Sequence, residues 1–122
     1  MAQEKQFEEK VKKYLKEQGC WFLKYWGGGG YTKSGIPDIL VCCKGKFIGV
    51  EVKAADGKPS DLQIYNLRKI DTAGGFSILL YPKDFDMFKR LIEQPDNKKL
   101  YEVLKSRWKH FESIIKNESK GE

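Results

Sequence analysis

The chain has 122 residues, of which 40% are hydrophobic and 33% charged, so it is long enough to bury the core of one compact domain. No apolar run approaches the roughly 18–20 residues that a membrane helix needs, and the polar N-terminus does not resemble a secretory signal, so we expect a cytoplasmic protein. The net charge is +6, and residues 21–70 carry most of the basic surplus. This surplus favours polyanionic partners but does not identify one.

Hydrophobic spacing and turn residues predict the elements of the chain. Phe7, Val11, Tyr14 and Leu15 recur at helical spacing, and Gly19 follows them as a stop. Lys44-Gly45-Lys46 predicts a tight turn between two strands. In chain order, the predicted elements are a helix over 4–18, strands over 20–26, 38–43 and 46–54, a helix over 60–73, a strand over 76–81, and helices near 83–92 and 97–117.

This order, αβββαβ and then two helices, predicts an α/β fold. An antiparallel hairpin would join a parallel strand through a helical crossover, giving a mixed sheet flanked by helices. We expect a single domain over 1–122, with a core at about 4–82 and a C-terminal helical extension at about 83–117. The apolar stripe of the last helix favours packing on its own domain, although part of it could pair with a second subunit.

Two ionisable residues share one face of the predicted strand 46–54. Period two places Glu51 and Lys53 on the same side, where burial is costly unless each finds a partner. Asp38, at the start of the preceding strand, can be brought level with them by the hairpin. Two converging carboxylates repel unless a cation lies between them, and a hard divalent ion such as Mg²⁺ suits such a site. Lys53 could then orient or deprotonate the attacking water, or stabilise charge on a phosphate.

These residues also carry a family resemblance. Pro37-Asp38 followed by Glu51-Val52-Lys53 resembles the PD-(D/E)xK nuclease signature. With the segment 35–40, Gly57, Ser60 and Gln63, the chain resembles more narrowly the VRR-NUC family of virus-type replication-repair nucleases, and more distantly the archaeal Holliday junction resolvases. The resemblance implies a restriction-endonuclease-like fold, Mg²⁺- or Mn²⁺-dependent DNA cleavage and, for stand-alone viral or phage members, homodimers acting on branched DNA.

The resemblance also implies further site residues. It makes the Val52 carbonyl a metal ligand, places Gln63 near the active site, and puts a glutamate of the first helix there, which counting back from Gly19 selects as Glu8. Glu8 lies at the edge of the apolar arc, so an ordinary solvated role beside Lys12 remains equally open. Ser60 and Gln63 also fit a helix capping box, which gives both residues a sufficient structural role.

The glycine-rich stretch 27–35 does not fit a phosphate-binding P-loop, because Thr32 stands where that motif needs glycine and Pro37 follows where a helix must begin. We therefore expect no nucleotide cofactor. A loop that lets the DNA backbone approach Lys24 and Lys33 fits better, with a passive turn as the alternative. The expected DNA contacts are Lys24, Gly28, Gly29, Lys33, Lys58 and Ser60.

The chain has three cysteines, Cys20, Cys42 and Cys43, and two of them are adjacent. An odd number with an adjacent pair argues against a disulfide framework. We therefore expect the cysteines to be small core side chains in a reducing compartment. No Cys-x-x-Cys spacing supports zinc.

Taken together, these features of the sequence predict a metal-dependent DNA endonuclease for branched DNA in replication, recombination or repair. Asp38, Glu51, Lys53, Glu8 and Gln63 form its site, and Mg²⁺ or Mn²⁺ is its cofactor, as one or two ions. The competing hypothesis is a non-catalytic DNA-binding module with the nuclease fold.

Overall fold

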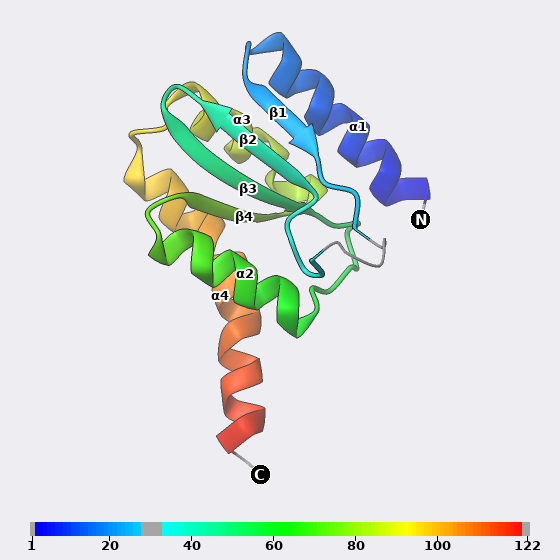
Figure 1. Ribbon diagram of the computed structural model, residues 1–122, viewed down its shortest axis with the longest axis vertical. Helices are drawn as coiled ribbons and strands as arrows, with labels where there is room; N and C mark the ends of the chain where they lie inside the picture. Colours follow the sequence, from blue (N-terminus) through cyan, green and yellow to red (C-terminus); the bar gives the residue numbers. More distant parts are fainter. Residues whose placement is uncertain (1, 28–32, 121–122) are drawn as a thin grey trace.

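The structure is a computed structural model that describes residues 2–27 and 33–120 (Figure 1). None of the helices described in it is long and apolar enough to cross a membrane. The elements are α1 (Ala2–Glu17), β1 (Trp21–Lys24), β2 (Ile39–Cys43), β3 (Lys46–Val52), α2 (Asp61–Thr72), β4 (Phe76–Leu80), the 3₁₀ turn η1 (Pro82–Asp84), α3 (Phe85–Glu93) and α4 (Lys98–Lys120).

Every predicted element is present and in the predicted order, with bounds that shift by a few residues. The largest difference among the strands is β1, which ends at Lys24 instead of residue 26. The predicted helix 83–92 is preceded by a 3₁₀ turn, because Pro82 can occupy a first helical position, where its missing N–H costs nothing.

The strands form one mixed sheet in the order β1-β2-β3-β4. β1 pairs with β2, and β2 with β3, in antiparallel fashion, whereas β3 and β4 are parallel and are connected through α2. The predicted hairpin and helical crossover are therefore confirmed, and with them the α/β class. The strand order places β3 in the interior of the sheet, between β2 and β4.

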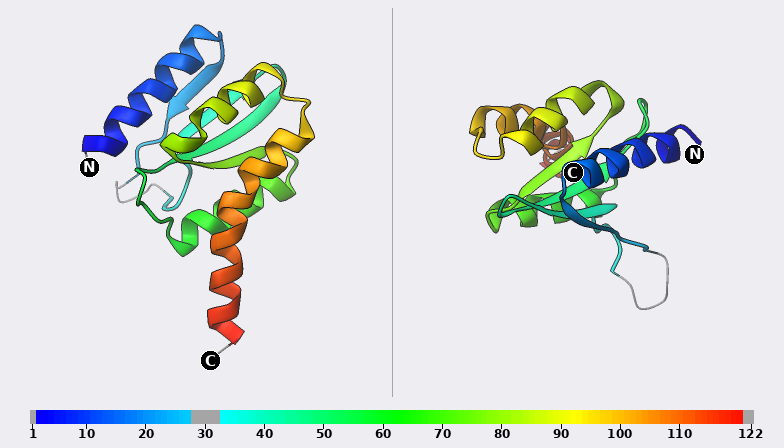
Figure 2. Two further views of the ribbon diagram at one scale, coloured as in Figure 1. Left: turned by 180° about the vertical axis from the view of Figure 1, so that it is seen from behind. Right: turned by 90° about the horizontal axis from the view of Figure 1, so that it is seen from above.

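Helices cover the two faces of the sheet unequally. Helices α1 and α3 lie on one face and α2 lies on the other, while α4 begins beside α3 and passes β4 to reach α2 (Figures 1 and 2). The larger core cluster joins α1, the sheet, α3 and the start of α4, while a smaller cluster joins α2, β4 and Trp108 of α4. All five residues of β4 are buried, as its continuous apolar run predicted. On the side of the sheet where α2 lies, Trp21 and Leu23 of β1 and Cys42 of β2 remain exposed, so α2 leaves this part of the sheet open.

The long helix α4 packs on its own domain over its first half and then projects away from the body (Figure 1). Leu104 and Trp108 are fully buried, and the Trp108 indole N–H donates to the Ser77 carbonyl over 2.9 Å. An ion pair between Arg68 of α2 and Glu112 ties the next turn to the domain. Val103 is 46% exposed, so part of the predicted apolar stripe is left uncovered.

The expectation of three unpaired cysteines was wrong, because Cys20 and Cys43 form a disulfide. The register that pairs Trp21 with Cys42 sets the neighbouring Cys20 and Cys43 side by side, with Cα atoms 4.8 Å apart, which is a distance that a disulfide accepts. Cysteine spacing could not reveal this pairing, since it depends on strand register. Cys42 is exposed and free, so the two adjacent cysteines do point to opposite faces.

Position 35 requires glycine for two reasons: its backbone conformation and the lack of space for a side chain. Its φ is +77°, and a Cβ atom there would lie 2.6 Å from Cγ and 2.9 Å from the carbonyl carbon of Leu62. This close approach fixes the loop before Asp38 against the first turn of α2.

We expect Gly35→Ala to lower the free energy of unfolding by about 2–4 kcal/mol, because left-handed strain and overpacking add. Gly45→Ala is the matched control: its φ is +80°, but an added Cβ meets nothing within 4 Å. It should cost only about 1 kcal/mol. Urea denaturation measures both, and equal losses would show that contact with Leu62 plays no part.

Candidate active site

Asp38 is held by backbone groups of both neighbouring strands. Its carbonyl accepts a hydrogen bond from the Tyr25 N–H at 2.8 Å, just beyond β1. Its carboxylate oxygen Oδ2 accepts one from the Val52 N–H at 2.9 Å, at the end of β3. The aspartate therefore has a fixed orientation beside Glu51, the residue before Val52.

Glu51 is a carboxylate in the interior of the sheet, with only 2% of its surface exposed. Its Oε2 accepts a hydrogen bond from the Gln63 amide at 3.1 Å and lies 3.5 Å from the Lys53 ammonium. Its Oε1 is buried and has no hydrogen-bond partner among the described residues. A buried carboxylate oxygen without a partner is costly in folding, which marks Glu51 as a candidate for ligand binding.

Burial and the nearby negative charge of Asp38 raise the pKa of Glu51 to about 8, although the Lys53 ammonium acts in the opposite direction. Near neutral pH the site can thus hold a proton or exchange it for another cation. A strongly perturbed carboxyl group beside a second carboxylate and a lysine is typical of functional sites.

The Lys24 ammonium links Glu8 to this pair. It lies 2.6 Å from Glu8 Oε1 and 3.7 Å from Asp38 Oδ1. Desolvation lowers the pKa of Lys24, but the hydrogen bond to Glu8 and the charges of Asp38 and Glu51 outweigh it, so the net shift is upward. Glu8 also lies 3.7 Å from Lys12, the neighbour that the solvated alternative named. The Lys24 ammonium thus links Glu8 to Asp38.

Gln63 combines the two roles that the sequence left open. Its backbone N–H donates to the Ser60 hydroxyl, and its side-chain oxygen accepts from the Ser60 N–H, so the capping box is confirmed. The remaining side-chain donor, Nε2, is the group that contacts Glu51. The cap therefore orients the amide group toward the carboxylate.

The predicted DNA contacts do not form one cluster. Gly28 and Gly29 lie outside the described residues. Lys33 is exposed at the edge of a cavity of about 310 Å³ that Lys24, Asp38 and Gln63 also line. Lys58 lines a different cavity, and Ser60 caps α2.

Sequence reasoning missed Trp26, which lines the cavity beside Asp38 and is 75% exposed. The Lys24 ammonium lies 5.4 Å from the centre of its ring. An exposed aromatic ring at the edge of a cationic cavity can stack on a nucleobase. The signal was present in the sequence as an aromatic residue next to a glycine-rich loop, but we assigned it to a strand.

The residues fit a magnesium-type ion with an open coordination shell. No three acidic, histidine or cysteine side chains converge into a ligand cage in the part of the chain that the structure describes. Mg²⁺ does not require such a cage, since it keeps several waters and binds through one or two carboxylates and substrate phosphates. Asp38 and the partnerless oxygen of Glu51 supply that donor set, with the adjacent Val52 carbonyl as a further candidate.

The arrangement of an aspartate at the mouth of one strand and Glu-x-Lys on the next is that of the PD-(D/E)xK nuclease superfamily. Residues 2–73 match the family model described as archaeal Holliday junction resolvase (Hjc). The chain therefore belongs to the archaeal Holliday junction resolvase family, the more distant of the two resemblances seen in the sequence. The narrower resemblance to virus-type nucleases remains a prediction.

Among solved structures, the chain is similar to Hjc of Archaeoglobus fulgidus, a Holliday junction resolvase from an archaeal hyperthermophile. The two chains are 20% identical with a TM-score of 0.48, and the match covers 64% of this chain and 69% of that one. No curated protein matches the chain.

Proposed function

We propose that the protein is a divalent-metal-dependent DNA endonuclease that is selective for branched DNA, with four-way junctions as its substrate. The observation that carries the proposal is the convergence of Asp38, Glu51 and Lys53, with one buried Glu51 oxygen left without a partner. Membership of the junction resolvase family supports the choice of substrate.

In this proposal, Asp38, Glu51 and the Val52 carbonyl would hold one or two Mg²⁺ or Mn²⁺ ions, with Glu8 as a further acidic group. When bound, the metal would polarise the scissile phosphate and neutralise its charge. The Lys53 ammonium lies beside the acid pair, where it can orient the attacking water and stabilise negative charge on the phosphate. Gln63 holds the Glu51 carboxylate in position.

Lys24 has a second role in the proposal. Its ammonium offsets the repulsion between Glu8 and Asp38, so it keeps the acidic groups together in the metal-free protein. Lys33 and Trp26 at the cavity edge would contact the DNA backbone and a base. Lys58, at the neighbouring cavity, and Gly28 and Gly29, outside the described residues, stay predicted DNA contacts.

The experiment compares a labelled four-way junction with flapped and linear duplexes of matched sequence, in Mg²⁺, Mn²⁺ or EDTA. We expect preferential junction cleavage with either metal and none in EDTA. Asp38→Ala should abolish cleavage, and Asp96→Ala, at an exposed acid outside the site, should not. Junction binding without cleavage in either metal would favour the DNA-binding module, and equal cleavage by Asp38→Ala and the parent would remove the proposed site.

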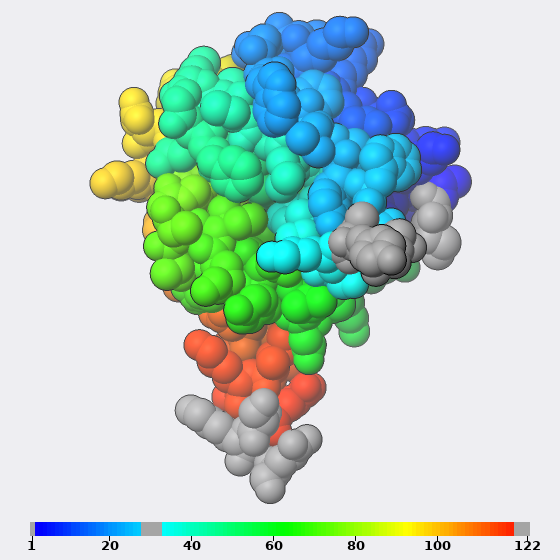
Figure 3. All heavy atoms as spheres, in the orientation of Figure 1, coloured from blue at the N-terminus to red at the C-terminus, as the bar shows by residue number. Residues whose placement is uncertain are grey.

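A homodimer would place two such sites against the paired strands of a junction. The face of the sheet that α2 leaves open is the one shown in Figure 3, and it carries exposed apolar side chains of β1 and β3 that would form this contact. Trp21 is 62% exposed, Leu23 40% and Phe47 44%, and the strand register aligns Trp21 with Cys42 and Cys42 with Phe47. Apolar surface of this kind commonly marks an interface between subunits.

We expect Phe47→Glu to convert the dimer to a monomer, because a charge placed beside Cys42 at the β3 side of this surface cannot be desolvated without a partner. Light scattering after size exclusion should then give one chain mass of 14.1 kDa in place of twice that value. Val103→Glu tests the uncovered part of α4 as a control and should leave the dimer intact. A dimer lost only in Val103→Glu would assign the interface to α4.

A further inference from the structure

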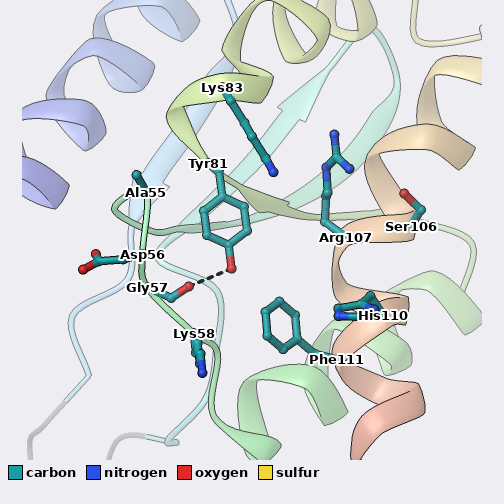
Figure 4. Close-up of a pocket in the computed structure, with 10 residues that line it drawn as sticks. All are labelled: Ala55, Asp56, Gly57, Lys58, Tyr81, Lys83, Ser106, Arg107, His110 and Phe111. Atoms are coloured by element: carbon teal, nitrogen blue, oxygen red, sulfur yellow. Dashed lines mark hydrogen bonds between the residues drawn. The ribbon is translucent and has the colours of Figure 1, made fainter.

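A second cavity, of about 680 Å³, lies on the other side of the loop that follows Lys53 (Figure 4). Part of its lining comes from this loop and from Tyr81 and Lys83, which follow β4, and the rest comes from α4. Much of it therefore lies outside residues 2–73, the span that matches the family model. Its volume is within the range of pockets that hold a small ligand.

The lining combines aromatic rings with cations. Tyr81, His110 and Phe111 supply the rings, and Lys58, Lys83 and Arg107 supply positive charge. Figure 4 shows these side chains arranged around a common space, with the Asp56 carboxylate directed away from Tyr81 and Arg107. Rings that can stack on a base, together with cations that can contact a phosphate, are the elements by which proteins hold single-stranded nucleic acid.

The cations are placed so that a ligand can use them. Arg107 is held by Asp84, which accepts from Nε at 3.0 Å and from Nη2 at 2.9 Å, so these two bonds do not use Nη1. Asp84 is buried and fixes the guanidinium plane. Neither Lys58 nor Lys83 has an acidic partner within 4 Å among the residues described.

One loop residue connects this cavity to the candidate active site. The Gly57 carbonyl accepts a hydrogen bond from the Tyr81 hydroxyl at 2.8 Å. On its other side, a Cβ atom at Gly57 would lie 3.2 Å from Cδ of Lys53. Gly57 therefore lies between the cavity and the Lys53 side chain, which places the cavity next to the candidate active site.

We propose that this cavity binds one nucleotide of the DNA strand that leaves the cleavage site. The base stacks on the His110 ring, which lies edge to face with Phe111 at 71° between the two planes. Lys83 and Arg107 contact the phosphate of this nucleotide, and Lys58, at the opposite end of the cavity, contacts the next phosphate of the strand. The identity of the bound strand, as the one that leaves the cleavage site, rests on the proposed function. The binding of a nucleotide in the cavity does not itself require cleavage. It gives α4 a role in DNA binding in addition to packing.

The test measures binding of labelled hexathymidylate by fluorescence anisotropy, in EDTA so that no cleavage occurs. His110→Ala, which removes an exposed ring, should weaken binding about tenfold. Lys83→Gln should weaken binding several-fold. It should also lower the slope of log Kd against the logarithm of the salt concentration by the amount expected for the loss of about one phosphate contact. Lys109→Gln, an exposed residue on α4 outside the cavity, is the matched control and should bind like the parent.

Two results would overturn the inference. One is unchanged binding by His110→Ala and Lys83→Gln; the other is free thymidine monophosphate binding as tightly as the hexamer, which would indicate a site for free nucleotides. Amide chemical shifts provide a second measurement, and the hexamer should move the signals of Gly57 and Lys83. If these variants lose binding while no protein cleaves junctions, the proposed function fails and the inference stands. If Lys53→Ala loses junction cleavage while His110→Ala and Lys83→Gln bind hexathymidylate like the parent, the inference fails and the proposed function stands.

Discussion

Lys53→Ala is expected to slow cleavage of a four-way junction about 10³-fold, because it removes a preorganised positive charge from the reacting centre. The Lys53 ammonium lies 3.5 Å from Glu51 Oε2, and its side chain is only 14% exposed, so bulk water screens this charge weakly. The loss should appear in the single-turnover rate constant with enzyme in excess. Junction affinity in EDTA should change by no more than about threefold, since a single cation is removed.

Lys46→Ala is the control for this prediction. Lys46 stands at the opposite end of the same strand, so its removal changes the net charge equally without touching the site. The Lys46→Ala variant should cleave the junction with a single-turnover rate constant within a few-fold of that of the parent. Equal losses in the two variants would mean that the effect is one of net charge, and unchanged cleavage in Lys53→Ala would exclude the proposed role of the ammonium.

Glu51→Gln is expected to stabilise the metal-free protein while it removes cleavage. The folded pKa of Glu51 is about 8 against an unfolded value of 4.5, so ionised Glu51 is disfavoured in the folded state. Each pKa unit corresponds to about 1.4 kcal/mol, and allowing for relaxation of the buried site we expect a gain of about 2–4 kcal/mol at pH 8. Glutamine cannot ionise and keeps a similar shape, so it avoids this cost.

The sign of the pH dependence follows from the direction of the shift. Below about pH 4.5 the carboxyl group is protonated in both the folded and the unfolded protein, and the parent and Glu51→Gln should be similarly stable. Between pH 4.5 and 8 the folded parent keeps a proton that the unfolded chain releases, so the stability of the parent falls as pH rises. Above pH 8 the difference between the two proteins should be constant.

Urea denaturation in EDTA from pH 4 to 9 measures this difference. Glu102→Gln is the control, because the Glu102 side chain is 63% exposed, and its effect should be small at every pH. A Glu51→Gln variant that is less stable than the parent at pH 8 would show that the carboxylate is well accommodated without a cation. That result would remove the physical argument for a metal at this position.

The fold was largely predictable because the strongest signals are local. The alternating residues of β3, the continuous apolar run of β4 and the glycines that end α1 and α2 each indicate their element directly. The Cys20–Cys43 disulfide was missed because it depends on the register between two strands. The hairpin, whose turn is short, could be placed from the sequence.

The site was predictable only in part. Pro37-Asp38 and Glu51-Val52-Lys53 have recognisable spacing, and the structure brings their side chains together. The placement of the Lys24 ammonium between Glu8 and Asp38 had no sequence signal, since it depends on how α1 crosses the sheet. The cavity lined by Tyr81 and α4 was equally hidden, because its residues are distant in sequence and the last helix showed only its apolar stripe.

The most direct measurement is titration of the metal-free protein with Mn²⁺, read by calorimetry and by the electron paramagnetic resonance of the free ion. We expect saturable binding by the parent and by Asp96→Asn, with binding lost in Asp38→Asn and in Glu51→Gln. A parent protein that binds no Mn²⁺ at saturating concentrations, or binding that survives both substitutions in the site, would contradict it.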